Sequence, residues 1–358
     1  GKGKEFVSFD PATGVPLISM NEATEKEVVQ AIDSARSAVK KWQLTSFAER
    51  IDYLKAIQAV VQSKKEELAQ AIGQESGKPL WEAKKEVAGM INIIDITQEA
   101  YTLRSDPNRH PLGNGINQTY YKPIGVMAVL GPFNFPGHLP FGHIIPAILA
   151  GNTILFKPSE YTPNVGRLLM QILDLAELPK GVVNGIQGGR KTGEMITDNA
   201  MIDGVLFTGS YAVGQKLHQK WVTKMEKMLA LELGGNNPLI VESTAHPKAV
   251  ESIIIQSAFI TSGQRCSCAR RLIMIRSDQN RQLLAKVQAR MGSIRIGGTQ
   301  DKPEPFMGPL ISRQAQEHAT SFMTQCVKNG GKYLEPIETS DVGYFCSAGV
   351  VDMSESRT

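Results

Sequence analysis

The residue with the clearest chemical potential in this chain is Cys266, which lies in the polar segment SGQRCSC at residues 262–268. The thiolate is the nucleophilic form of a cysteine, and an adjacent cation such as the guanidinium of Arg265 favours it. The alternative is a small buried thiol that only fills space, which is the more frequent role of a lone cysteine. The local pattern leaves these two interpretations about even.

Two other segments place a polar side chain among apolar neighbours. Glu232 lies between two leucines in LELGGNNP (231–238). A carboxylate there is either a tuned general base or a paired charge in the core, and the second is the commoner case. Asn134 lies in GPFNFP (131–136), after an apolar run. Its amide is either a turn former or a donor for an oxyanion that develops during a reaction.

Two strand-to-helix turns have groups suited to a nucleotide. The segment FTGSYAVG (207–214) follows an apolar run and opens a helical pattern, a context in which backbone N–H groups bind phosphate. Its spacing differs from the dinucleotide fingerprint GxGxxG. Lys157 and Glu160 follow another strand pattern, where they form either a pair that binds ribose hydroxyls or a solvated loop. His138 and His143 come without the further ligands of a metal site, so no metal is predicted.

The elements that must position these residues alternate between strands and helices. From about residue 124 the sequence has short apolar runs, at 124–130, 153–156, 182–186, 205–208 and 238–241. Helical patterns fall between most of them, at 143–150, 164–176 and 213–221. This alternation predicts an α/β fold with a mostly parallel sheet that is covered on both faces. Such sheets bind ligands at the carboxyl ends of their strands.

The regions on either side of this segment are also patterned. The first hundred residues are helical, with Thr24 and Ser46 as the expected N-caps of two helices. After two glycines at 234–235 a second α/β segment begins, which predicts a separate domain. Its expected elements are helices near 246–260 and 279–290 and a strand at 272–275.

The overall composition excludes several classes of protein. The 358 residues are 42% hydrophobic and 21% charged, which excludes disordered and fibrous classes. Acidic and basic residues are interspersed and the net charge is +4, so no nucleic-acid partner is predicted. Four cysteines are too few for a disulfide scaffold and favour a reducing, cytoplasmic setting. Residues 123–156 contain no Asp, Glu, Lys or Arg, but repeated prolines and glycines favour a buried strand–loop–helix–strand over a membrane span.

Several of these segments together resemble one enzyme family. They are GPFNFP (131–136), AGNTILFKPSE (150–160), FTGS (207–210), LELGGNNP (231–238) and GQRCSCARR (263–271). In residues and order they resemble the aldehyde dehydrogenase superfamily, and Glu232 precedes Cys266 by the 34 residues that are familiar in it. Within the superfamily, residues 131–152, 229–241 and 256–271 are similar to the N-succinylglutamate 5-semialdehyde dehydrogenases of bacterial arginine catabolism.

The resemblance implies a domain organisation. A Rossmann-type NAD-binding domain would comprise residues 1–103 and 123–234, an oligomerisation arm residues 104–122, and a second α/β domain, the catalytic one, residues 235–358. The family's EIFGP-like segment and its last strand would lie beyond residue 358, so the catalytic domain is expected to be incomplete at its C-terminal end. From the full-length members of the family, the resemblance also implies a homo-oligomer, a dimer or a tetramer.

The resemblance also implies roles for the residues singled out above. Cys266 would be the nucleophile, Glu232 the general base, and Asn134 with the Cys266 N–H the oxyanion hole. Lys157 and Glu160 would hold the adenosine ribose, and the carboxylate of Glu160 should favour NAD over NADP. The NAD pyrophosphate would lie along Gly209, Ser210, Tyr211, Ala212, Val213 and Gly214.

The expected reaction is the NAD-dependent oxidation of N-succinyl-L-glutamate 5-semialdehyde, a small-molecule aldehyde, to N-succinyl-L-glutamate through a cysteine thiohemiacetal and thioester. Three alternatives stay open: another semialdehyde dehydrogenase, a chain that binds NAD without turnover, and a cysteine hydrolase. The hydrolase is disfavoured because this chain has no histidine near Cys266 in the sequence. One of Arg265, Arg270 and Arg271 could bind a substrate carboxylate, unless these arginines are paired within the protein. Cys268 could form a disulfide with Cys266 on oxidation.

Overall fold

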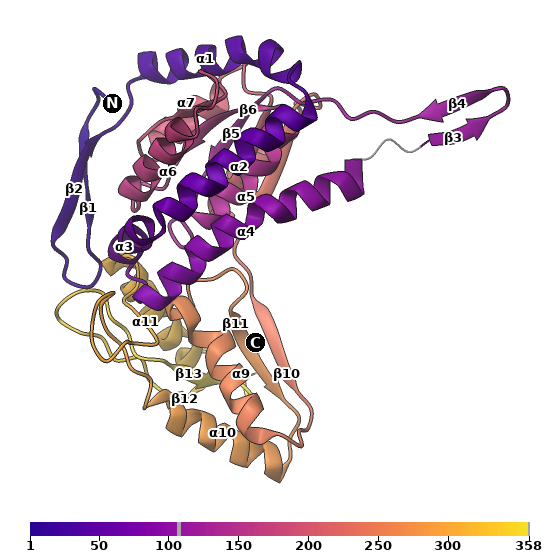
Figure 1. Ribbon diagram of the computed structural model, residues 1–358. Helices are drawn as coiled ribbons and strands as arrows, with labels where there is room; N and C mark the ends of the chain where they lie inside the picture. The colour runs from indigo at the N-terminus through magenta and orange to yellow at the C-terminus, as the bar shows by residue number, and fades with distance from the viewer. Residues whose placement is uncertain (106–108, 357–358) are drawn as a thin grey trace. The chain divides into compact units, whose positions relative to one another are not determined.

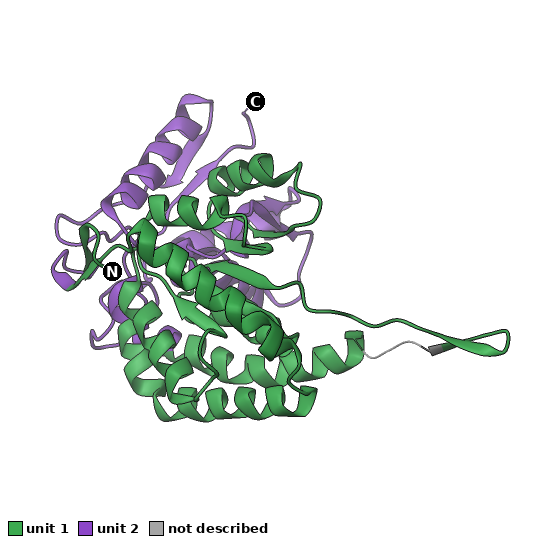
Figure 2. Ribbon diagram, turned by 90° about the horizontal axis from the view of Figure 1, so that it is seen from above, with its two compact units in different colours: residues 1–8, 18–71, 84–233 green, residues 9–17, 72–83, 234–358 purple. Residues whose placement is uncertain are grey.

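The computed structural model describes residues 1–105 and 109–356 of the chain. They form two compact units (Figure 2). Unit 1 comprises residues 1–8, 18–71 and 84–233, and unit 2 comprises residues 9–17, 72–83 and 234–358.

Two short segments, 9–17 and 72–83, lie within the predicted first domain by sequence but belong to unit 2. Backbone hydrogen bonds tie them to later parts of the chain. The N–H of Leu80, for example, donates to the carbonyl of Thr299 at 3.1 Å. The NAD-binding and catalytic roles assigned to the two domains stay predictions.

Unit 1 is built on a five-stranded parallel sheet (Figure 1). Its strands are, in spatial order, β7 (Val183–Gly185), β6 (Thr153–Lys157), β5 (Val126–Leu130), β8 (Gly204–Thr208) and β9 (Met228–Glu232). This is the order of the first five strands of a Rossmann sheet, and it reverses between β5 and β8. The predicted α/β fold is therefore confirmed, and the carboxyl ends of β5 and β8 are where such a sheet binds ligands.

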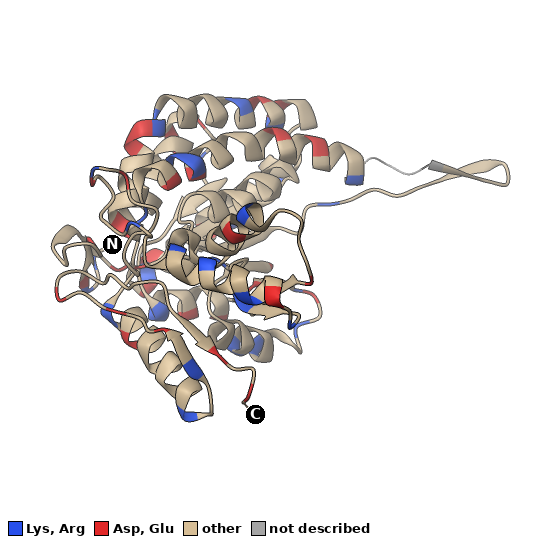
Figure 3. Ribbon diagram, turned by 90° about the horizontal axis from the view of Figure 1, so that it is seen from below, with Lys and Arg blue, Asp and Glu red and all other residues tan. Residues whose placement is uncertain are grey.

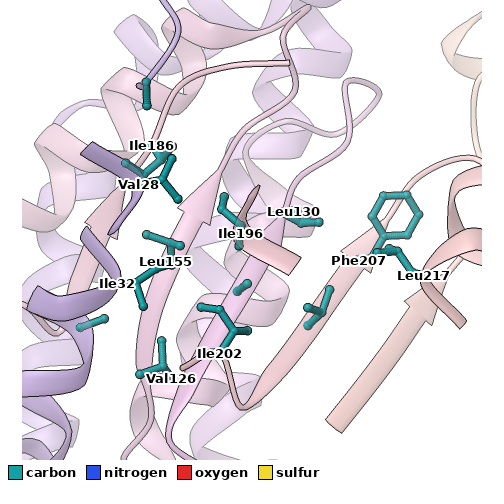
Figure 4. Close-up of a cluster of buried hydrophobic side chains, with 14 of the residues drawn as sticks. Val28, Ile32, Val126, Leu130, Leu155, Ile186, Ile196, Ile202, Phe207 and Leu217 are labelled. Atoms are coloured by element: carbon teal, nitrogen blue, oxygen red, sulfur yellow. The ribbon is translucent and has the colours of Figure 1, made fainter. Parts of the chain in front are cut away.

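Helices cover both faces of this sheet. One face is covered by α1 (Glu25–Gln43), α7 (Arg190–Asp198) and α8 (Tyr211–Trp221). On the other face lies α5 (His138–Leu149). Helix α2 (Phe47–Ser63) packs against α5 and also contacts α6 (Pro163–Leu175). Figure 4 shows Val28 and Ile32 of α1 against Val126 and Leu155 of the sheet. The next residue of β5, Met127, is also buried, because α5 covers the opposite face.

Local sequence signals explain where several of these helices begin. Thr24 and Ser46 form the predicted capping boxes, with Glu27 and Glu49 as the returning carboxylates. Hydrogen bonds from the backbone N–H groups of Thr24 and then Lys2 lower the pKa of Glu27 to about 2.

α5 begins at His138, five residues before the start predicted from the apolar pattern at 143–150. Pro140 lies in its first turn, where a helix needs no backbone N–H. Pro140 is therefore compatible with a helix that begins at His138. The uncharged stretch 123–156 forms β5, α5 and β6, the buried arrangement predicted for it. In the described part of the chain, no helix is both long and apolar enough to cross a bilayer.

Unit 1 also carries a hairpin of β3 (Arg109–Leu112) and β4 (Gly115–Gln118), which pair only with each other among the described strands. Charged residues of both signs are interspersed over the helices, whereas residues 110–121 contain no Asp, Glu, Lys or Arg (Figure 3). Leu112 and Ile116 are about 70% exposed there. The remaining elements in this part of the chain are β1 (Glu5–Phe9), β2 (Pro16–Asn21), α3 (Lys65–Ser76) and α4 (Leu80–Ser105).

Unit 2 contains a parallel pair of strands, β10 (Asn237–Val241) and β11 (Ala269–Met274). Its other elements are α9 (Pro247–Phe259), the 3-10 turn η1 (Ile260–Gly263), α10 (Asp278–Met291), α11 (Arg313–Lys328) and the antiparallel strands β12 (Lys332–Glu335) and β13 (Val350–Asp352). Buried side chains from β10, α9 and α10 form its core, including Val241, Ile254 and Leu283. The expected strand and two helices of this segment are all present.

Candidate active site

Cys266 lies in the loop between η1 and β11 of unit 2 and is exposed. The neighbouring Cys268 is 2% exposed, and its Sγ donates to the carbonyl of Ile260 at 3.5 Å. Burial raises the pKa of the Cys268 thiol. The buried structural thiol is therefore Cys268, and its raised pKa makes it a poor partner for the disulfide considered above.

The backbone before Cys266 has an unusual conformation. Thr261, Ser262 and Gly263 follow one another with φ angles of 55°, 54° and 73°, in the left-handed region. Threonine is β-branched and enters this region rarely, at a cost of about 1–2 kcal/mol. Such a conformation persists only where the surroundings fix it.

Side chains around the loop provide that fixation. The hydroxyl of Ser262 donates to Gly308 O at 2.7 Å, and Oε1 of Gln264 accepts the N–H of Ile311 at 3.0 Å. On the other side of the loop, Nδ2 of Asn237 donates to the carbonyl of Cys266 at 2.6 Å.

The Cys266 loop lies close to the backbone of Gly235, just before β10, because Gly235 has no side chain. A Cβ at this position would come within 2.7 Å of the carbonyl oxygen of Cys266. The chain is thus held on both sides of an exposed thiol.

The three arginines near Cys266 all have partners within unit 2. Nη2 of Arg265 lies 2.7 Å from Oε1 of Glu82. Arg271 donates to Asn236 O at 2.9 Å and Arg270 to Arg265 O at 3.2 Å. Pairing within the protein, the alternative to a substrate clamp, therefore applies to Arg265, whose partner is a buried carboxylate.

In unit 1, three polar residues lie where β8 and β9 end. Glu232 is exposed, not buried as a core charge, and its backbone carbonyl accepts the N–H of Gly209 at 3.0 Å. Nε2 of His143 lies 3.1 Å from Oγ1 of Thr208. Burial lowers the pKa of His143, and the nearby carboxylate of Glu232 opposes that shift. Sequence reasoning weighed His143 only as a metal ligand. Its position in the helix that follows the Asn134 turn is the sequence signal for its place near Glu232.

Asn134 lies in the turn between β5 and α5, and its Oδ1 accepts the N–H of Phe135 at 3.1 Å. The start of α5 is held by Glu86 on α4, whose Oε1 accepts the N–H groups of Gly137 and His138 at 2.9 and 3.1 Å. Glu86 is 4% exposed. Sequence reasoning did not identify it, because a glutamate in a charged helical segment is usually solvated.

The turn that opens α8 fits an anionic group. Ser210 is the N-cap, and its hydroxyl accepts the N–H of Val213 at 3.4 Å. Tyr211, Ala212 and Val213 of the first turn are exposed, and the N–H groups of a first turn face outward with a partial positive charge. A Cβ at Gly209 would come within 2.4 Å of the ring of Phe207. The absence of a side chain at Gly209 therefore leaves room for the ring of Phe207 beside this turn.

Lys157 is the last residue of β6, and Glu160 follows three residues later. Nζ of Lys157 donates to Pro158 O at 2.7 Å and to Gly188 O at 2.8 Å, and it lies 3.8 Å from the carboxylate of Glu160. Burial lowers the pKa of Lys157. The side chain of Glu160 is 46% exposed, so its carboxylate is accessible to the hydroxyl groups of a ligand. Across residues 1–105 and 109–356, no three His, Cys, Asp or Glu side chains form a group that could hold a metal ion.

Comparison with known proteins identifies the family of this chain. A model of the aldehyde dehydrogenase family matches residues 1–357. The chain belongs to the aldehyde dehydrogenase family. A curated N-succinylglutamate 5-semialdehyde dehydrogenase of Escherichia coli (strain K12) is 43% identical over 99% of this chain and 72% of its own length.

Solved aldehyde dehydrogenases have the same fold. An NAD+ complex of an aldehyde dehydrogenase from Bacillus cereus matches 97% of this chain and 71% of its own, with a TM-score of 0.91 and 28% identity. An NADP-dependent glyceraldehyde-3-phosphate dehydrogenase from Bacillus halodurans, complexed with NADP, matches 99% and 75%, with a TM-score of 0.89 and 28% identity. This aldehyde dehydrogenase is thus an oxidoreductase of a family that uses NAD or NADP. The roles of its individual residues stay predictions.

Proposed function

We propose that this aldehyde dehydrogenase oxidises N-succinyl-L-glutamate 5-semialdehyde to N-succinyl-L-glutamate, with NAD as the hydride acceptor, in arginine catabolism. The observation that carries the proposal is an exposed thiol, Cys266, in a loop that is fixed on both sides. The relative from E. coli with 43% identity supports the substrate.

In the proposed reaction, the thiolate of Cys266 attacks the aldehyde carbon and forms a thiohemiacetal whose oxygen is negatively charged. The amide N–H of Asn134 and the backbone N–H of Cys266 donate to that oxygen. NAD, when bound, accepts the hydride. The carbon is then held as a thioester on Cys266. Glu232 removes a proton from water, the water attacks the thioester, and the carboxylate product leaves with the thiolate restored.

For the cofactor, we assign the pyrophosphate to the turn that opens α8 and the adenosine ribose to Lys157 and Glu160. The partial positive charge at the first turn of α8, whose residues are exposed, suits an anion, and the accessible carboxylate of Glu160 suits ribose hydroxyls. Lys157 is held by two backbone carbonyls, so it also fixes the end of β6 to the loop at Gly188. A 2′-phosphate would face the carboxylate of Glu160, which favours NAD over NADP.

We infer further that the protein forms homo-oligomers through an arm at residues 104–122. Support comes from the β3–β4 hairpin and the residues that follow it, where Leu112, Ile116, Tyr120 and Tyr121 are 60–70% exposed. Exposed apolar residues on a hairpin with open edges favour association. Sedimentation equilibrium measures this directly, and a monomer at all concentrations would contradict it.

The test of the proposed function is NADH formation by the purified chain with N-succinylglutamate 5-semialdehyde. Cys266→Ala should abolish turnover, while Cys326→Ala, at a half-buried free thiol of α11, should retain it. Turnover that persists in Cys266→Ala would contradict the cysteine mechanism. A higher kcat/KM with glutamate 5-semialdehyde would assign the rival substrate, and NAD binding without turnover of either aldehyde would contradict the proposed activity.

A further inference from the structure

A buried carboxylate lies against the backbone that precedes Cys266. Glu82 is in the first turn of α4, in the part of that helix that belongs to unit 2, and it is 1% exposed. Its Oε1 accepts hydrogen bonds from the hydroxyl of Thr261 and from Nη2 of Arg265, the second at 2.7 Å. A charge this deeply buried is retained only when it is paired and hydrogen-bonded.

The two partners of Glu82 are also bonded to each other. Nε of Arg265 donates to Oγ1 of Thr261 at 2.6 Å. Glu82, Thr261 and Arg265 therefore form a closed network of three side chains. Thr261 is the first residue of the left-handed turn, and Arg265 directly precedes Cys266.

This network spans the strained part of the loop. Its two loop members lie on either side of Ser262, Gly263 and Gln264, so a fixed carboxylate at Glu82 sets the position of both ends of the turn. A β-branched residue with φ near 55° needs such an external anchor, because its own preference is for another region. The conformation of that turn therefore sets the position of the backbone N–H and the thiol of Cys266.

We propose that Glu82 is a positioning residue for the reaction: through Thr261 and Arg265 it holds the left-handed turn that orients Cys266. The inference rests on the proposed nucleophilic role of Cys266. It also gives Arg265 a structural task, since its guanidinium is bound to Glu82 and not presented to the substrate. An aligned nucleophile matters because misplacement by about 1 Å can cost about a hundredfold in rate.

The first experiment replaces the carboxylate by its isosteric amide, Glu82→Gln. We expect kcat to fall by about tenfold to a hundredfold, while the KM for NAD stays within about twofold. Independently of turnover, amide hydrogen exchange of the peptide 259–268 should accelerate by about tenfold or more in the protein without ligands, because the turn has lost its anchor. The matched control is Asp203→Asn, which alters a half-buried arginine–carboxylate pair, with Arg36, in unit 1.

The control separates positioning from general destabilisation. Asp203→Asn should lower the melting temperature without accelerating exchange in residues 259–268. The proposal is wrong if Glu82→Gln leaves that exchange unchanged, or if its kcat falls no further than that of the control. These exchange data decide the matter even if the parent chain oxidises no aldehyde, so failure of the proposed function is seen separately.

A second pair of variants tests the same network without touching the carboxylate. Thr261→Val keeps the β-branched shape and removes the hydroxyl, so it should reproduce the loss of kcat and the faster exchange. Thr261→Ser keeps the hydroxyl and should restore both close to the parent values. Equal behaviour of the two variants would show that the hydroxyl bonded to Glu82 does not position the loop.

Discussion

The loop that carries Cys266 and the turn that opens α8 fix their chains in different ways. The Cys266 loop has three consecutive left-handed residues, and side-chain hydrogen bonds hold it to other parts of unit 2, among them those from Ser262 to Gly308 O and from Asn237 to Cys266 O. The α8 turn has ordinary angles at its N-cap Ser210 and joins a regular strand to a regular helix. Individual side chains therefore fix the conformation of the Cys266 loop, whereas the regular strand and helix on either side fix that of the α8 turn.

The difference predicts how each region responds to mutation. Where side chains hold a strained backbone, a single substitution removes an anchor and displaces the reacting group. Where regular elements hold a turn, a substitution costs one local hydrogen bond and leaves the backbone in place. We therefore expect large kinetic effects in the Cys266 loop and small, mainly structural effects at the α8 turn.

The largest effect is expected at the nucleophile itself. Cys266→Ser should lower kcat by about a thousandfold or more, because a hydroxyl has no activating base in this loop and is a weak nucleophile. Fluorescence titration should give NAD affinity close to that of the parent. A kcat within about tenfold of the parent would contradict covalent catalysis by Cys266.

The next effect belongs to Glu232, at the end of β9. Glu232→Gln should lower kcat by about a hundredfold to ten-thousandfold, since it removes the general base for hydrolysis. Attack by Cys266 and hydride transfer do not need this base, so rapid mixing should show a burst of NADH followed by slow turnover. Loss of the burst together with the steady state would place Glu232 in an earlier step.

The candidate roles of both residues come from short sequence motifs that resemble those of the family, and these roles stay predictions. Much of the sheet could be predicted too: β5, β6 and β8 contain continuous apolar runs, and Thr24 and Ser46 carry the chemistry of an N-cap. The sequence pattern misses β9, and the apolar run at 238–241 forms β10 of unit 2 and not a strand of this sheet. What these signals share is that each is local, so a window of a few residues contains it.

The anchors of the Cys266 loop could not be found in this way. Glu82 lies in the segment LWEAKKEV, whose charges resemble a solvated helical face, and its partners are more than 170 residues away. Nothing in the propensities of Thr261 or Ser262 indicates a left-handed backbone, since only Gly263 favours it. Long-range hydrogen bonds decide these conformations, and they leave no periodic pattern.

A smaller effect is expected at Glu160, the residue proposed to bind the ribose. Glu160→Gln should raise the KM for NAD by about tenfold, because hydrogen bonds to a charged group contribute about 1.5–3 kcal/mol. It should also narrow the preference for NAD over NADP, since the repulsion of a 2′-phosphate is gone. Initial rates with both cofactors measure this, and an unchanged ratio of kcat/KM would show that Glu160 does not select the cofactor. The control is Glu194→Gln, an exposed glutamate of α7 paired with Arg190.

The smallest effect on kcat is expected for a variant of the α8 turn, and it distinguishes the two regions most clearly. Ser210→Ala removes the N-cap of α8, and thermal or urea unfolding should show a loss of about 1 kcal/mol in the free energy of unfolding. The turn is also fixed by the backbone hydrogen bond from Gly209 to Glu232 and by the buried Gly214, so kcat should change little. A stability loss of similar size at Thr261 should instead be accompanied by a large fall in kcat, because there the side chain sets the backbone. If Ser210→Ala lowers kcat as strongly as Thr261→Val, the α8 turn also depends on individual side chains, and the distinction between the two regions fails.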